Sequence, residues 1–224
     1  MNHALSNYKT TSRDVAQTTS RSSFLRCTIL FFLLVGGILV ITPADWYPSW
    51  LFPKVAGLGL VAYALLATLP HFIFARRGQP SDEARRRALQ RLENVIGFGL
   101  LLSAAGMLGF YELYRYGFEY DKVIHFLFPL LGALVISQFF HVWYEIAFTR
   151  AVYLTALLIF AGSIMWEFYE FTADQVFHSG AFGQGGTRIF EDTTLDLLMN
   201  FFGISFAVLI TKSRFSSRFS RSSP

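Results

Sequence analysis

Long apolar stretches separated by short polar segments make up most of this chain from residue 24 onward. Several of these stretches reach about 18–20 residues, the length that an α-helix needs to cross the hydrocarbon core of a bilayer. The pattern therefore predicts an all-α fold, a polytopic bundle of transmembrane helices. We expect six spans, at residues 24–42, 54–75, 92–114, 121–143, 150–171 and 192–211.

The two ends of the chain are polar and rich in Ser, at residues 1–23 and in the segment KSRFSSRFSRSSP, residues 212–224. We predict two disordered tails that flank a single membrane domain, residues 24–211. A basic flank before an apolar core is also typical of a signal peptide. Because the segment ITPAD after the first span is a poor cleavage site, we expect that span to be retained.

Composition supports the membrane class. The chain is 53% hydrophobic and 15% charged, whereas a soluble domain carries about 25% charged residues. A single cysteine, Cys27, excludes an intrachain disulfide and a Cys-rich metal site. We expect membrane lipid as a partner and no nucleic acid.

Lys and Arg are distributed unevenly between the two sides of the predicted bundle. Of the 19 basic side chains, 15 lie in the N-terminal segment, the loop 76–91, the C-terminal tail or at Arg150. Because cytoplasmic loops carry an excess of Lys and Arg, we expect both termini in the cytoplasm. Binding of anionic lipid or a protein partner is an alternative role for the loop 76–91, but the topological role is preferred. The four basic residues on the other side are Lys54, Arg115, Lys122 and Arg188.

Acidic residues gather at the predicted outer ends of the last three spans, at helical spacing. A rise of about 1.5 Å per residue places His125, Glu167 and Asp196 at one depth, about 6 Å below the outer surface. We therefore expect the three helices to face their polar groups into one water-accessible pocket. The residues concerned are Asp121 and His125 in the fourth span, Glu167, Glu170 and Asp174 in the fifth, and Asp192, Asp196 and Asn200 in the sixth.

Carboxylates brought together repel one another unless they keep protons or bind a cation. Imidazole, carboxylate and amide oxygen ligands suit a divalent cation such as Zn²⁺, Mn²⁺ or Mg²⁺. Such an ion could polarise a phosphoryl or carbonyl oxygen and activate water, or one Glu could act as a general base without metal. The predicted metal ligands are Asp121, His125, Glu167, Glu170, Asp192 and Asp196, and the predicted catalytic residues are His125, Glu167, Glu170 and Asp196.

The segment HSGAFGQGGTRIFED, which begins at His178, connects the last two spans. Its four glycines leave backbone N–H groups free to hold an anion, and Arg188 could join them. A simple Gly-rich connector is the alternative, and by itself it is the favoured interpretation.

The motifs DKVIH, WEFYE and EDTTLDLLMNFFG together resemble the YjdF-like family of bacterial inner-membrane proteins and, more distantly, the VanZ-like proteins. The similarity covers about residues 95–211. It implies a multi-pass protein of the bacterial inner membrane without a settled activity, and the distant relation implies a role in the cell envelope. The matching positions are Asp121, His125, Trp166, Glu167, Glu170, Asp192, Asp196, Asn200 and Gly203.

Three functions fit the predicted pocket. The first is a metal-assisted hydrolase or transferase acting on an unidentified envelope substrate, and the second is a non-catalytic factor that binds a small envelope ligand. The third, a proton- or cation-coupled transporter, is less favoured because the spans are apolar beyond Asn200 and show no repeat. The polar residues also have structural alternatives: Asp192 as a helix N-cap, and His125, Glu167, Glu170 and Asn200 as hydrogen-bonding groups between helices.

Overall fold

The computed structural model describes residues 22–48, 51–75, 83–177 and 189–219 of the 224-residue chain. Helices form nearly all of these segments, and no strand occurs within them, so the prediction of an all-α fold is confirmed. Two short 3₁₀ helices, η1 (Ala44–Trp46) and η2 (Phe110–Tyr116), follow the first and third long helices. The six long helices are α2 (Ser23–Ile41), α3 (Pro53–Ala75), α4 (Glu83–Met107), α5 (Tyr120–Tyr144), α6 (Phe148–Phe177) and α7 (Ile189–Phe219).

Five of the long helices are apolar enough over a sufficient length to cross a membrane: α2, α3, α5, α6 and α7. The sixth candidate consists of α4 and η2, which are bent by 54° relative to each other. The prediction of one continuous helix over residues 92–114 is therefore wrong at its end. The physical reason is Gly109, whose φ of 133° is open to glycine but strained for other residues.

Two predicted boundaries also differ from the structure. Helix α4 begins at Glu83, inside the predicted loop 76–91, because the segment EARRRALQRL consists of strong helix formers. Helix α7 continues past residue 211 to Phe219 and so includes part of the predicted C-terminal tail. The predicted N-terminal tail lies outside the described residues, except for Ser22 and Ser23 at the start of α2.

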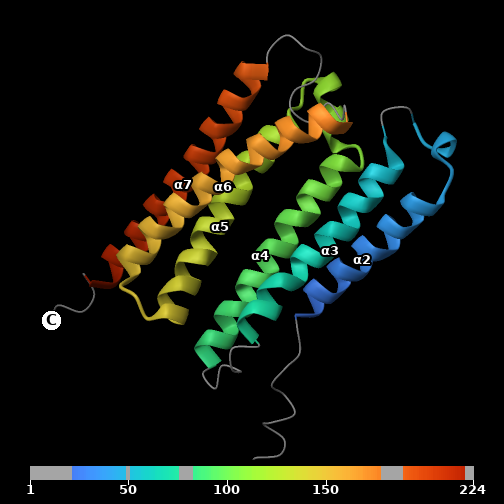
Figure 1. Ribbon diagram of the computed structural model, residues 1–224. Helices are drawn as coiled ribbons and strands as arrows, with labels where there is room; N and C mark the ends of the chain where they lie inside the picture. The colour runs from blue at the N-terminus through green and yellow to red at the C-terminus, as the bar shows by residue number, and fades with distance from the viewer. Residues whose placement is uncertain (1–21, 49–50, 76–82, 178–188, 220–224) are drawn as a thin grey trace, which may run out of the picture.

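The helices are arranged around α5, which contacts α4 on one side and both α6 and α7 on the other (Figure 1). Helices α2 and α3 pack closely together and lie against α4. One apolar core, which includes Phe32 and Leu60, joins α2, α3 and α4. A second core, which includes Leu92 and Phe139, joins α4 to α5.

Large apolar side chains cover much of the outside of the bundle. Leu30, Leu65, Leu157 and Leu209 are each more than half exposed. A surface of this kind is costly in water, and a bilayer removes that cost because lipid tails solvate it. The outward-facing leucines thus agree with the membrane assignment made from helix length.

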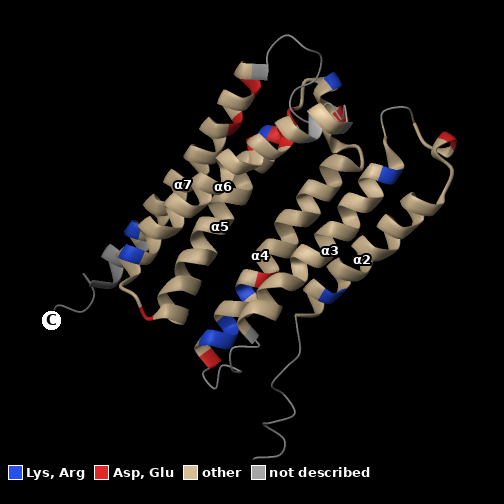
Figure 2. Ribbon diagram, in the orientation of Figure 1, with Lys and Arg blue, Asp and Glu red and all other residues tan. Residues whose placement is uncertain are grey.

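Charged side chains lie mainly at the two ends of the bundle (Figure 2). At the end where α5 and α7 begin and α6 terminates, acidic residues predominate, and we call this the acidic end. We call the opposite end the basic end. Its described basic residues are Arg26, Arg85, Arg86, Arg87, Arg91, Arg150 and Lys212.

Gly203 of α7 packs directly against the backbone of α5. A Cβ atom at this position would collide with the carbonyl oxygen of Phe126 and lie 3.2 Å from the amide nitrogen of Leu130. We expect Gly203→Ala to force the two helices apart and to lower the free energy of unfolding by about 1–3 kcal/mol. Thermal unfolding in detergent, followed by circular dichroism, measures the effect.

Gly162 of α6 provides the matched control, because a Cβ atom there would meet nothing within 4 Å. Both substitutions raise helix propensity equally, by about 1 kcal/mol. Gly162→Ala should therefore leave the unfolding temperature unchanged or raise it. Equal unfolding temperatures for the two variants would contradict close packing of α7 on α5.

Candidate metal centre

His125 lies at the centre of a polar cluster at the acidic end. It belongs to the second turn of α5, one turn after Asp121, and its side chain is 6% exposed. Helix α6 brings Glu167 to this point, and α7 brings Asp196 and Asn200, which are four residues apart on one helix face. The structure thus brings polar groups from three helices to one place, as the helical spacing predicts.

The two ring nitrogens of His125 face different groups. Nε2 lies 3.5 Å from Oδ1 of Asp121 and 3.9 Å from Oδ1 of Asp196. Nδ1 lies 3.0 Å from Nδ2 of Asn200 and 3.7 Å from Oε1 of Glu167. Because an amide NH₂ only donates, Nδ1 accepts this hydrogen bond and the ring proton in this arrangement is on Nε2, facing the aspartates.

Lys122 is the main site residue that the sequence pattern did not reveal. Its Nζ lies 2.5 Å from Oδ1 of Asp192, 2.7 Å from Oδ1 of Asp196 and 3.5 Å from Oδ2 of Asp121. In the sequence this lysine contributes only to the count of basic residues that sets the topology. Its position three residues before His125, on the same face of α5, was the available clue.

The Lys122 ammonium changes the electrostatic account of the cluster. Sequence spacing suggests only two means by which the carboxylates avoid repulsion, protons or an added cation. The chain supplies a cation of its own, which pairs with Asp192 and Asp196, two of the predicted metal ligands. Asp196 is almost fully buried, so this pairing occurs largely away from solvent.

Glu167 and Glu170 form the part of the cluster that belongs to α6. Oε1 of Glu167 is buried and has no hydrogen-bond partner among the described residues. Glu170 is less buried and accepts a hydrogen bond of 2.8 Å from Nε1 of Trp166, one turn earlier on the same helix. Glu167 therefore carries an unpaired buried oxygen, whereas Glu170 is held at the edge of the site.

Two groups of potential metal ligands share His125: one with Asp121 and Asp196, the other with Glu167 and Glu170. Within each group the ligand atoms lie within 4.8 Å of one another. Such separations allow a common ion at the usual ligand distances of about 2.0–2.6 Å. The Lys122 ammonium 2.7 Å from Asp196 would repel an ion in the first group, so electrostatics favour the second.

Other predicted site residues contribute less or are not described. Asp192 is in the first turn of α7, where a carboxylate is favourable, and reaches Lys122 from a partly exposed position. Arg188 and residues 178–187 lie outside the described residues, as does the side chain of Asp174. The anion-binding role of the Gly-rich segment thus stays a prediction.

A second buried ion pair lies on the other side of the bundle, nearer the basic end. Nδ1 of His71 in α3 is 2.9 Å from Oε1 of Glu93 in α4, and the Glu93 side chain is 3% exposed. The sequence pattern does not single out Glu93. Its position shortly after the Arg-rich turns of α4 is typical of a polar surface, whereas the structure places it between helices.

Comparison with known proteins gives one match. The model of a family described as "Predicted membrane protein (DUF2238)" matches residues 24–218. No curated protein and no solved structure gives a significant match. The matched segment runs from α2 into the last turn of α7, so it includes every described residue of the cluster around His125.

Proposed function

Because the chain belongs to the DUF2238 family of predicted membrane proteins, we propose that it is a multi-pass membrane protein that binds one divalent cation at its acidic end. The ligands are His125, Glu167 and Glu170. The membership agrees with the resemblance to YjdF-like proteins, and the more distant VanZ-like resemblance stays a prediction.

One observation carries the proposal: the buried Oε1 of Glu167 lacks a hydrogen-bond partner among the described residues and lies 3.7 Å from Nδ1 of His125. A buried carboxylate oxygen without a partner costs several kcal/mol, as an order of magnitude. A cation between this oxygen and the ring nitrogen would remove that cost. Glu170, within reach of the same point, would supply a second negative charge.

The ligand set also limits the identity of the ion. One imidazole nitrogen with carboxylate oxygens, and no thiolate, suits Zn²⁺ or Mn²⁺ better than a cation that takes only oxygen ligands. Asn200 now donates to His125 Nδ1. A half-turn of its amide would exchange the NH₂ for the carbonyl oxygen, which makes Asn200 a further candidate ligand.

The reaction class that this site supports is metal-assisted hydrolysis or group transfer. A bound divalent cation supplies Lewis acidity, which polarises a phosphoryl or carbonyl oxygen and activates water. Lys122 acts as a positioning residue, because its ion pairs hold Asp121 and Asp196 on either side of the His125 ring. A phosphorylated or lipid-linked envelope molecule is the proposed substrate class.

An envelope substrate requires the acidic end to face away from the cytoplasm. The excess of Lys and Arg at the opposite end supports this orientation in the inner membrane of a bacterium. Single cysteines at the exposed positions Glu119 and Arg86, in a Cys27→Ser background, test it in intact cells. A membrane-impermeant maleimide should label Glu119→Cys at once and Arg86→Cys only after permeabilisation, and the reverse pattern would refute the orientation.

Elemental analysis tests cation binding itself. The full chain is purified in detergent, incubated with Zn²⁺ or Mn²⁺, and dialysed against metal-free buffer. We expect about one ion per chain, removable by a strong chelator. A protein that stays folded but retains no metal after loading with either ion would overturn the proposal.

A further inference from the structure

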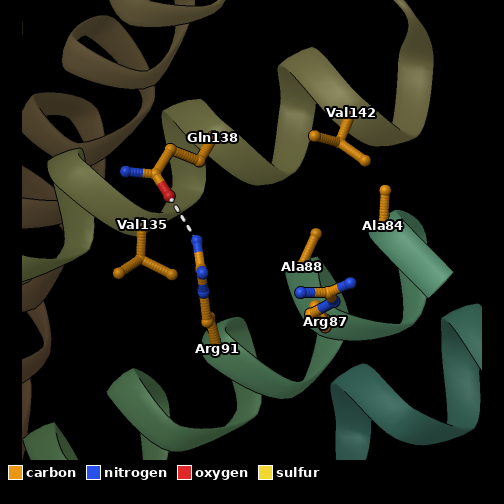
Figure 3. Close-up of a pocket in the computed structure, with 7 residues that line it drawn as sticks. All are labelled: Ala84, Arg87, Ala88, Arg91, Val135, Gln138 and Val142. Carbon is orange, nitrogen blue, oxygen red and sulfur yellow. Dashed lines mark hydrogen bonds between the residues drawn. The ribbon is translucent and has the colours of Figure 1, made fainter.

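A cavity of about 230 Å³ lies between α4 and α5 at the basic end, far along both helices from the cluster around His125 (Figure 3). Figure 3 shows α4 contributing two arginines and α5 contributing two valines and one glutamine. The lining thus combines positive charge with an apolar wall. The residues concerned are Arg87, Ala88, Arg91, Val135, Gln138 and Val142.

Arg91 has positive charge available for a ligand. It donates a hydrogen bond of 3.1 Å to Oε1 of Gln138, a neutral amide. Within the described part of the chain, no carboxylate lies at ion-pair distance from the Arg91 guanidinium. A guanidinium has five N–H donors in a planar fork, so Arg91 can hold Gln138 and an anionic oxygen together.

Arg87 is the second cation of the cavity. Its only ion pair among the described residues is with Glu83, one turn earlier on α4, at 2.7 Å, and both side chains are more than half exposed. An exposed pair of this kind contributes little free energy, so an anion can compete for the arginine. Arg85 is different, because it pairs with Glu145 across the connection between α5 and α6.

The opposite wall is apolar. Val135 and Val142 of α5 are two turns apart on one helix face, and Ala88 of α4 is buried opposite them. A small free anion such as phosphate would leave these side chains uncovered. A ligand that fills the whole cavity needs an anionic group attached to a hydrocarbon chain.

We propose that this cavity binds an anionic phospholipid. The phosphate contacts Arg91 and Arg87, and the adjoining hydrocarbon lies against Val135 and Val142. Basic pockets between transmembrane helices on the cytoplasmic side bind anionic head groups, and the cavity opens at the end of the bundle where arginine is concentrated. The inference is independent of the metal proposal.

Native mass spectrometry of the detergent-purified full chain tests this inference. Phosphatidylglycerol and phosphatidylcholine are added at equal concentration, and the lipid retained on the protein is counted. We expect preferential retention of phosphatidylglycerol, and a decrease of about tenfold or more in the variant Arg87→Gln/Arg91→Gln. Val142→Phe should also reduce retention, because it fills the cavity without changing the charge.

The matched control is Arg26→Gln/Arg150→Gln, which removes two exposed arginines from the same end on other helices. This variant should retain phosphatidylglycerol as the native chain does. Equal losses in both double variants, or equal retention of the two lipids, would overturn the inference. Displacement by inorganic phosphate alone, with Val142→Phe unaffected, would identify a simple anion site and also overturn it.

Discussion

The substitution Glu167→Gln is expected to weaken binding of Zn²⁺ or Mn²⁺ by about 100-fold or more. The two side chains have nearly the same shape, so the change removes a charge without opening a cavity. A unit charge about 4 Å from another, at an effective dielectric constant of about 20, contributes about 4 kcal/mol. Loss of a directly ligating carboxylate therefore exceeds the roughly 2.8 kcal/mol that corresponds to 100-fold in affinity.

The stability of this variant gives a second, opposite sign. Without metal, Glu167→Gln removes a buried charged oxygen that has no hydrogen-bond partner among the described residues, so the variant should unfold at the same temperature as the native chain or higher. With saturating metal, the native chain should gain stability through ligand binding and the variant should not. A variant that merely misfolds would lose stability under both conditions.

Glu119→Gln is the control for loss of negative charge at the acidic end. Glu119 is exposed, precedes the first turn of α5 and makes no side-chain cap hydrogen bond. Its replacement should change metal affinity by about twofold at most, because exposed charges are screened by salt. Isothermal titration with Mn²⁺ measures both variants. Affinities of Glu167→Gln and the native chain that agree within about twofold would remove Glu167 from the ligand set.

The substitution Lys122→Met is expected to lower the free energy of unfolding by about 3 kcal/mol. Met has nearly the length of Lys but cannot neutralise a carboxylate. Asp196 decides the size of the effect, because its side chain is 3% exposed and loses its nearest cation. Asp192 and Asp121 are about a third exposed or more, so water screens them and they contribute less.

A double-mutant cycle separates this electrostatic effect from loss of packing. In Lys122→Met/Asp196→Asn both charges are absent, and most of the lost stability should return. Unfolding in detergent by heat or by a denaturing detergent, followed by circular dichroism, gives the four values. Lys54→Met, which removes an exposed lysine from the start of α3 at the same end, is the control. If the double variant is no more stable than Lys122→Met, the ion pair with Asp196 is not the cause.

The general architecture was accessible from the sequence because the bilayer imposes length and polarity directly. Apolar runs located the long helices, and residues at spacings of three and four placed His125, Glu167 and Asp196 on faces that could meet. Helix α4 differs from its prediction at both ends for opposite reasons. Its first turns are polar yet helical, and its last predicted turns contain Gly109, which permits a break that hydropathy does not detect.

The pairing of charges within the site was not accessible in the same way. Lys122 and Asp192 are 70 residues apart, and their contact depends on how α5 and α7 cross. Counting Lys122 only as a topology signal concealed its role, because one lysine can serve the positive-inside pattern or an ion pair. Likewise, spacing identified Asn200 but did not show that its amide would occupy the ring nitrogen that faces Glu167.

The alternatives to an enzyme share the same cluster and differ in the event that cation binding would bring about. A non-catalytic factor would bind the ion and a small envelope molecule without turnover. In a transporter, ionisable side chains would continue toward the basic end. Within the described parts of α6 and α7, the next charged residues in that direction are Arg150 and Lys212, at the basic end itself. The cluster is thus a site at one end of the bundle.

Pulsed electron paramagnetic resonance of the Mn²⁺-loaded protein tests the proposed ligand set most directly. A cation held between α5 and α6 predicts coupling of the ion to one imidazole nitrogen, abolished by His125→Gln and retained in His141→Gln, which changes a histidine at the other end of α5. A spectrum without nitrogen coupling, or one that His125→Gln leaves unchanged, would contradict this ligand set.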